Sequence, residues 1–148
     1  MPYTFQHLDD PQALAASFAL MGVLRPHLND QDRYVAQLVR QAEQGYRLLA
    51  AQEGERLVGL AGYRELENLL YGRFIYVDDL VVSPQLQRSG VGAQLLNAVR
   101  ERAVQRDCDH LVLDTGLHMP LAQRFYFRQG LLARGMHFTQ SLRAGSPA

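Results

Sequence analysis

The chain is 148 residues long, the usual size of one domain built around one hydrophobic core. Hydrophobic residues make up 47% and charged residues 20%, which excludes a disordered or fibrous protein. Fifteen basic and fifteen acidic side chains give a formal net charge of +0, so no overall field attracts nucleic acid or an anionic membrane. We therefore predict a single domain, residues 1–148, with neither nucleic acid nor membrane as a partner.

The chain has one cysteine, Cys108, so an internal disulfide is excluded and a reducing compartment is the natural setting. A catalytic thiolate there is disfavoured by the charges of Asp107 and Asp109, and we interpret Cys108 as structural. The N-terminus resembles no secretory signal, and no apolar stretch reaches about 18 residues. The predicted location is cytoplasmic.

The N-terminal part of the chain alternates between strand and helix signals. Residues 3–8 predict a short strand, and residues 11–22 predict a helix with a proline in its first turn. A second helix is expected to be capped by Asp30 or Asp32 and to end at Gly45.

Three apolar runs in the middle of the chain predict strands. Residues 46–51 and 57–63 flank a short polar connection that contains glycine, so we predict an antiparallel hairpin. Residues 74–82 predict a third strand. Its last three residues, 80–82, are all apolar, which predicts burial on both faces and a central place in the sheet.

The C-terminal part begins with a strong helical pattern over residues 90–105. A short buried strand at 110–113, a helix at 118–129 closed by Gly130, and a final strand pair over 131–142 are predicted to follow. This order predicts fold class α/β (α+β), with helices packed on the faces of a mixed sheet.

The sharpest local signal is the segment Gln87-Arg88-Ser89-Gly90-Val91-Gly92, which follows a predicted buried strand and opens directly into a helix. Such a turn directs backbone N–H groups and the positive end of the helix dipole at one spot, which suits a phosphate. The segment lacks the lysine of a Walker A loop and the third glycine of a dinucleotide fingerprint. The structural alternative is a glycine turn that merely starts a helix.

After this loop come a long helix, a short strand, and then the segments Ala122-Gln123-Arg124-Phe125-Tyr126 and Gly130-Leu131. In this order of elements the chain resembles the GNAT N-acetyltransferase superfamily over most of its length. The resemblance implies a mostly antiparallel sheet that is splayed at its fourth strand and flanked by about four helices. It also implies acetyl-CoA as the co-substrate. Met119 departs from the asparagine of many members and Ser89 from their glycine; neither change removes a group required for acyl transfer.

The resemblance also assigns residues to the co-substrate. The loop would bind the pyrophosphate of acetyl-CoA, and the preceding strand would hydrogen-bond the pantetheine arm as if it were an added strand. The implied binding residues are Leu80, Val81, Val82, Gln87, Arg88, Ser89, Gly90, Val91, Gly92, Ala93 and Tyr126.

Tyr126 is the catalytic tyrosine that the resemblance implies. A phenol with a reference pKa of about 10 has a proton to give to the departing thiolate, so Tyr126 is the candidate general acid. The alternative is core packing, because Phe125, Tyr126 and Phe127 are consecutive aromatics and at least one of them must face the interior of a helix.

Asp78 and Asp79 are the candidates for the group that takes a proton from the attacking ammonium or attracts it. Polyamine-type acetyltransferases of the family carry an acidic pair at a similar place, where it binds the substrate or acts through water. Neighbouring strand residues point to opposite faces, so only one aspartate should face a given cleft. A structural role at a bulge is the alternative.

The histidines give weaker signals. His118 is a candidate base or substrate contact, although hydrogen bonding at a helix start is the simpler use. His110 and His137 lie in predicted apolar strands and should be packed, while His7 and His27 are remote in sequence. With no His-x-x-x-His or Cys-His spacing, no metal is predicted.

The sequence thus predicts direct transfer of an acetyl group from acetyl-CoA to a primary amine of a small molecule, without an acyl-enzyme intermediate. Two alternatives are a protein lysine or N-terminal acetyltransferase and a CoA-binding module without catalysis. A nucleotide-binding protein is a further rival. The oligomeric state is left open, with a homodimer as one alternative, because members of the family often pair through their last strands. The candidate acceptor contacts are Tyr34, Tyr71, Tyr76 and Glu65.

Overall fold

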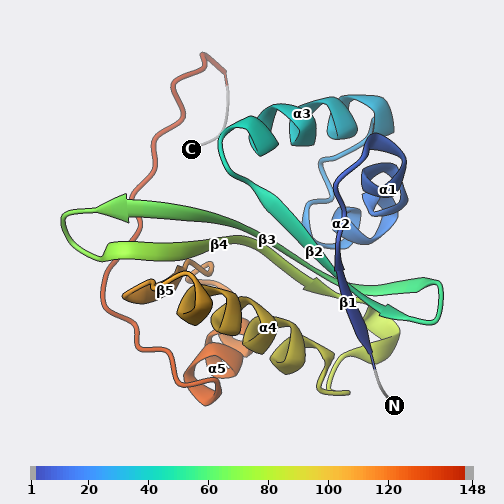
Figure 1. The fold of residues 1–148 in the computed structure, drawn as a ribbon. Coiled ribbons are helices and arrows are strands. Elements are labelled where there is room, and N and C mark those ends of the chain that lie inside the picture. The colour runs from blue at the N-terminus through green and yellow to red at the C-terminus, as the bar shows by residue number, and fades with distance from the viewer. Residues whose placement is uncertain (1–2, 146–148) are drawn as a thin grey trace. The chain divides into compact units, whose positions relative to one another are not determined.

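The structure is a computed structural model in which residues 3–145 are described. The chain divides into two compact units, one up to Leu113 and one from Asp114, and each is described by itself. The first unit contains a five-stranded sheet in the order β1-β2-β3-β4-β5 (Figure 1). All neighbouring strands are antiparallel except β4 and β5, so the prediction of a mixed, mostly antiparallel sheet is confirmed.

The five strands of the sheet lie where the sequence predicted strands, and β3 is much longer than predicted. They are β1 (Thr4–His7), β2 (Arg47–Glu53), β3 (Arg56–Asn68), β4 (Gly72–Val82) and β5 (His110–Leu113). β3 extends beyond its prediction because it pairs with β4 as far as Asn68 opposite Gly72.

Helices cover both faces of the sheet in the first unit. On one side lie α1 (Pro11–Ala16), α2 (Phe18–Leu24) and α3 (Gln31–Glu43), and on the other lies α4 (Val91–Gln105) (Figure 1). Asp30 caps α3 by accepting a hydrogen bond from the backbone N–H of Arg33, which decides between the two predicted caps.

The helix predicted over residues 11–22 is divided at Ser17. The backbone N–H and the Oγ of Ser17 both donate to the carbonyl of Leu14, and Oγ also bonds the hydroxyl of Tyr34 at 2.7 Å. A serine that bonds the backbone in this way competes with the regular helical pattern. Because Ser17 is fully buried, this break is part of the core and separates α1 from α2.

The core has one layer on each face of the sheet. The layer beneath α1–α3 contains Leu8, Leu14, Met21, Tyr34, Leu38, Tyr46, Leu48, Ala50, Leu60 and Val81. On the other face Val91 and Leu95 of α4 are fully buried. They approach β3 closely at Gly59, where a Cβ atom would lie 3.2 Å from each side chain.

β4 is splayed away from β5, as predicted. β5 pairs with β4 only from Phe74 to Val77, whereas β3 follows β4 as far as Val82. The edge of β4 over residues 78–82 is therefore not covered by β5. Burial on both faces was predicted there, but Leu80 and Val82 are half-buried and only Val81 is buried, because the sheet opens at this place.

The second unit contains helix α5 (Pro120–Arg128), and the predicted Gly130 follows it in the left-handed region at φ 91°. The strand pair predicted over residues 131–142 is wrong, since these residues form no strand in the described part of the chain. A strand needs a neighbouring edge for its backbone groups, and alternation of apolar residues does not provide one. Within residues 3–145, no helix is both long and apolar enough to cross a membrane.

Candidate functional site

The loop between β4 and α4 turns the chain through two residues with left-handed backbone. Pro84–Leu86 forms one 3-10 turn, and Ser89 then donates a hydrogen bond from Oγ to the carbonyl of Leu86. Arg88 has φ 70° and Gly90 has φ 91°. Such angles strain an arginine but not a glycine, so Gly90 is the residue that the turn requires.

Within residues 3–145, the first turn of α4 leaves three backbone donors without partners. No side chain caps the helix, and its first backbone bond runs from the N–H of Gln94 to the carbonyl of Gly90 at 3.0 Å. Among the residues that the structure describes, no group accepts from the N–H of Val91, Gly92 or Ala93. These donors and the helix dipole form an anion-binding cradle, and a Cβ on Gly90 would meet nothing within 4 Å.

A β-bulge lies in β4 at the predicted acidic pair. Gly62 of β3 is opposite Asp79 and Tyr63 is opposite Val77, which leaves Asp78 without a partner in β3. A bulge interrupts the strict alternation of side chains, so both carboxylates can be directed towards arginines. The bulge supports the alternative prediction, a structural role for Asp78 and Asp79. It does not exclude a role for them in the reaction.

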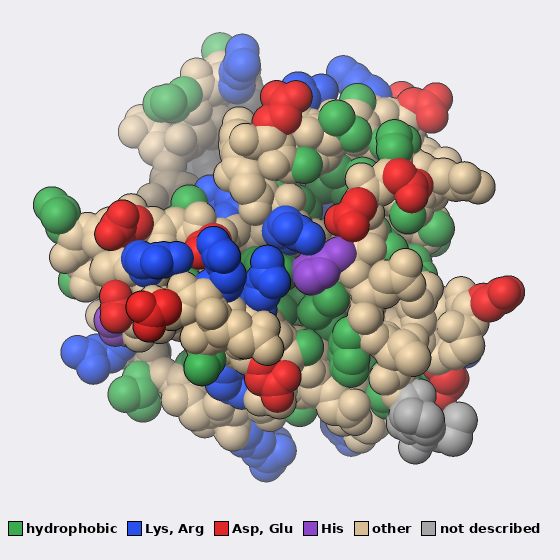
Figure 2. Space-filling view, viewed as in Figure 1, with side chains coloured by type: hydrophobic (Ala, Val, Ile, Leu, Met, Phe, Trp, Pro, Cys, Tyr) green, Lys and Arg blue, Asp and Glu red, His purple; other side chains and the backbone are tan. Residues whose placement is uncertain are grey.

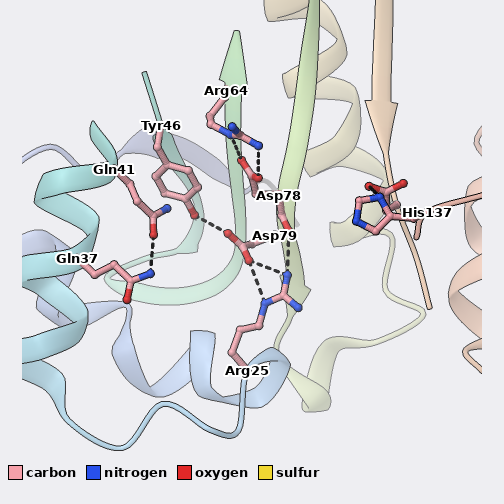
Figure 3. A network of polar contacts seen from close by, with 9 residues as sticks. Arg25, Gln37, Gln41, Tyr46, Arg64, Asp78, Asp79 and His137 are labelled. Carbon is pink, nitrogen blue, oxygen red and sulfur yellow. Dashed lines mark hydrogen bonds and ion pairs between the residues drawn. The ribbon is translucent and has the colours of Figure 1, made fainter. Parts of the chain in front are cut away.

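Each aspartate binds an arginine from another element (Figure 3). Arg64 of β3 donates from Nε and Nη2 to the two carboxylate oxygens of Asp78, at 2.9 and 2.8 Å. Arg25, at the end of α2, donates from Nε and Nη2 to Oδ1 of Asp79, at 3.1 and 2.9 Å. The Nη2 of Arg25 also donates to the backbone carbonyl of Asp78 at 2.9 Å. The two ion pairs neutralise both carboxylates.

Tyr46 completes the network by donating from its hydroxyl to Oδ2 of Asp79 at 2.8 Å. Burial, reinforced by the charge of Asp79, holds the pKa of Tyr46 well above its usual range, so the hydroxyl keeps its proton. The ring passes beside Gly62, where a Cβ atom would overlap both the ring and its hydroxyl. The bond to Asp79 therefore depends on the absence of a side chain at Gly62.

We expect Gly62→Ala to destabilise the fold by about 1–3 kcal/mol, the usual effect of overpacking, and to displace Tyr46 from Asp79. The control is Gly22→Ala in α2, where a Cβ meets nothing within 4 Å and the better helix propensity of alanine should add about 1 kcal/mol. Urea unfolding of both variants measures the two changes. A Gly62→Ala protein as stable as wild type would contradict this account of Tyr46.

A small pocket of about 140 Å³ opens beside this network, within the first unit. Its polar lining includes Arg25, Asp79 and Tyr46, together with Tyr34, one of the predicted acceptor contacts. The remaining lining residues are Met21, His27, Leu28, Gln37, Leu38 and Gln41. The pocket therefore joins the α1–α3 layer to the bulge in β4.

Tyr126 lies on α5 in the second unit. Its ring meets that of Phe125 edge to face, with centroids 5.3 Å apart. Burial raises the pKa of Tyr126, so the phenol holds its proton at neutral pH. The side chain of Gln123 donates to the carbonyls of Gly116 and Leu117 and ties the preceding loop to this helix. The general-acid role of Tyr126 stays a prediction.

The other predicted acceptor contacts are engaged elsewhere. Glu65 pairs with Arg73 and Arg106, at 2.9 and 3.0 Å. Tyr71 packs against Phe74 and His110, and the guanidinium of Arg64 lies 5.4 Å from the centre of the Tyr76 ring. Of the four residues, only Tyr34 lines the pocket.

Cys108 lacks the setting of a reactive thiolate. Burial raises the pKa of its thiol, and the charge of Glu65 acts in the same direction. This supports the structural interpretation of Cys108, although the carboxylate responsible is mainly Glu65 rather than the neighbouring Asp109.

The histidines make separate contacts. His7 bonds the hydroxyl of Tyr63 at 2.7 Å, and its pKa is lowered by burial and by the charge of Arg47. Figure 2 shows several basic side chains to one side of a histidine on the face in view. His110 bonds the carbonyl of Tyr71 at 2.7 Å, so it is not simply packed, and His118 precedes α5 instead of beginning it. His137 lies 3.4 Å from Asp114. In the described residues, no three metal-binding side chains converge.

Sequence reasoning missed Arg25, Arg64, Tyr46 and Gly62. Arg25 and Asp79 are 54 residues apart, and Tyr46 and Asp79 are 33 apart. No local pattern connects positions so distant. The available signal was the acidic pair itself, because half-buried carboxylates in a sheet require partners.

The comparisons with known proteins agree with this fold. The sequence model described as the Acetyltransferase (GNAT) family matches residues 12–131, which is most of the chain and includes the cradle, the acidic pair and Tyr126. The chain therefore belongs to the GNAT acetyltransferase family. The predicted class, an acetyl-CoA-dependent N-acetyltransferase with the fold of this family, is confirmed.

One curated relative is the aminoalkylphosphonate N-acetyltransferase of Salmonella typhimurium strain LT2. It is 33% identical over 95 residues, which cover 64% of this chain and 61% of that protein. The match thus spans about three fifths of the length of that relative.

Solved structures share the fold at low identity. The aminoglycoside N-acetyltransferase AAC(6')-Iy in complex with CoA has a TM-score of 0.83 at 16% identity, covering 96% of both chains. An aminoglycoside acetyltransferase from an uncultured soil metagenomic sample, in complex with sisomicin, has a TM-score of 0.79 at 17% identity, covering 95% of this chain and 97% of that one.

Proposed function

We propose that this protein transfers the acetyl group of acetyl-CoA directly to a primary amine of a small molecule. The observation that carries the proposal is the cradle at the start of α4, where three backbone N–H groups have no acceptor among the described residues. A diphosphate supplies the anionic oxygens that such donors bind. Gln87, Arg88 and Ser89 lead into this cradle and are exposed.

The adjacent strand suits the amide-containing arm of the same co-substrate. Residues 78–82 of β4 have an edge that β5 does not cover, which supports pairing of Leu80, Val81 and Val82 with an extended ligand. Three strand residues span about 10 Å. With the diphosphate at the cradle, the arm would run back along β4 and bring its reactive end towards Asp79.

The reaction needs one proton removed from the amine and one given to the sulfur as the C–S bond breaks. Acetyl-CoA supplies an activated acyl group, so the protein acts mainly by positioning the two reactants. Tyr126 is the proposed donor to the leaving sulfur, which its raised pKa permits because the phenol stays protonated at neutral pH.

We still propose that Asp78 or Asp79 accepts a proton from the substrate ammonium or attracts that ammonium by its charge. Within residues 3–145, Oδ2 of Asp79 accepts one hydrogen bond, from Tyr46, and a carboxylate oxygen has two lone pairs. Oδ2 can therefore still accept from an ammonium or from water.

Two observations support a small acceptor. The pocket beside Asp79 has about 140 Å³, well below the range of about 300–1,000 Å³ for drug-sized ligands. In addition, the names of the curated relative and of the aminoglycoside enzymes describe transfer to small-molecule amines. We expect the same class of acceptor here.

Calorimetric titration with acetyl-CoA, ATP and NAD, followed by mass spectrometry of amine products, tests the proposal. Saturable binding of acetyl-CoA alone and a mass increase of one acetyl group on an amine are expected. All fifteen basic residues are arginine, so lysine acetylation of the enzyme itself adds no background. A folded protein that does not bind acetyl-CoA contradicts the proposal; binding without turnover on any amine favours the non-catalytic module.

A further inference from the structure

We infer that the pocket beside Asp79 binds an acid group of the acceptor, so that the preferred substrates are short amines bearing a carboxylate or a phosphonate. This inference rests on the proposed function and adds a substrate class to it. The inference depends on Arg25, a residue that no local sequence pattern identified as functional.

Arg25 is held in place by its partners before any substrate arrives. Its Nε and Nη2 bind Oδ1 of Asp79, and Nη2 also binds the backbone carbonyl of Asp78, as Figure 3 shows. Its Nη1 takes no part in these bonds, and the side chain is 42% exposed where it lines the pocket. A guanidinium fixed along one edge presents its other donors in a set direction, and planar donors of this kind match carboxylate and phosphonate oxygens.

The other polar groups of the pocket favour an anion over a second cation. Among the lining residues, Asp79 is the one carboxylate; Arg25 and Tyr46 bind it, and the lone pair that Oδ2 keeps is the one proposed for the amine of the same acceptor. The hydroxyl of Tyr34 is taken by Ser17. His27 also lines the pocket, and its ring carries an N–H donor in either tautomer.

The size of the pocket limits the rest of the ligand. A volume of about 140 Å³ equals the share of about five water molecules in the liquid. Met21, Leu28 and Leu38 give this space an apolar wall, which suits a short carbon chain. Since Asp79 adjoins Leu80 on β4, a chain of a few carbons would connect an acid group at Arg25 with an amine at the proposed thioester position.

The test compares matched amines: propylamine with 3-aminopropanoate, and ethylamine with 2-aminoethylphosphonate. We expect kcat/KM to be about ten- to a hundredfold higher for each acid-bearing amine, the usual effect of a charge-assisted hydrogen bond. In Arg25→Gln this ratio should fall to about one, and in Arg25→Lys, which keeps the charge without the planar fork, to an intermediate value. The control is Arg40→Gln on the exposed side of α3, which should keep the wild-type ratio.

The ratio of kcat/KM for the acid-bearing amine to kcat/KM for the uncharged amine is measured within one protein. A general loss of activity in a variant lowers both values and therefore does not change the ratio. Direct titration with propylphosphonate, which has no amine, adds a readout that needs no turnover: wild type and Arg40→Gln should bind it, and Arg25→Gln should not. Acetyl-CoA binding checks that each variant is folded. Equal kcat/KM for uncharged and acid-bearing amines, or no propylphosphonate binding by wild type, overturns the inference. The proposed function fails separately, through absence of acetyl-CoA binding.

Discussion

Gly90→Glu is expected to raise the Kd for acetyl-CoA by about a hundredfold or more, the loss expected when two or more charge-assisted hydrogen bonds are removed. The new carboxylate would lie at the cradle formed by the N–H groups of Val91, Gly92 and Ala93, where it would repel a diphosphate. Calorimetric titration measures the change, and circular dichroism establishes that the variant is folded.

The backbone at Gly90 requires a matched control, because φ is 91° there and any side chain is strained. Gly45 follows α3 with φ 94°, and a Cβ there also meets nothing within 4 Å. Gly45→Glu should therefore lose the same stability, about 1–2 kcal/mol, without loss of acetyl-CoA affinity. Equal losses of affinity in both variants would assign the effect to strain, and normal binding by Gly90→Glu would refute the cradle.

The features that could be predicted from the sequence are those set by neighbouring residues. The strand before residue 82, the turn at Gly90 and the helix that starts at Val91 all follow from short-range signals, and all three are present. The cap at Asp30 is equally local. Because the cradle consists of consecutive backbone groups, its geometry follows from the loop and helix alone.

The features that could not be predicted depend on contacts between distant segments. Ser17 interrupts a helix because it meets Leu14 and Tyr34 in the core, and Arg25 reaches Asp79 only once α2 lies on the sheet. The prediction of a strand pair over residues 131–142 was wrong for the same reason. Alternation of apolar and polar residues specifies which face of a strand is buried, but it does not specify the strand with which it pairs. The acidic pair was recognised from the sequence, but not the arginines that bind it.

Tyr126→Phe is expected to lower kcat by about 10²–10⁴-fold, the usual contribution of a general acid, with little change in the Kd for acetyl-CoA. The substitution removes the hydroxyl and leaves the ring that packs against Phe125. Core packing alone would give the opposite result, an unchanged kcat. The matched control is Tyr71→Phe, because the ring of Tyr71 packs against Phe74 and His110 in the first unit.

The pH dependence separates proton donation from a positional effect. Burial raises the pKa of Tyr126, so the phenol loses its proton only as the pH rises through a value above the ordinary one of about 10. The ratio of kcat between wild type and Tyr126→Phe should therefore stay constant between about pH 7 and pH 9, and should fall only at higher pH as the wild type loses its acid form. Stopped-flow rates over this range measure the ratio. A ratio that declines already near pH 8 would contradict a raised pKa of Tyr126, and with it this account of Tyr126 as the donor.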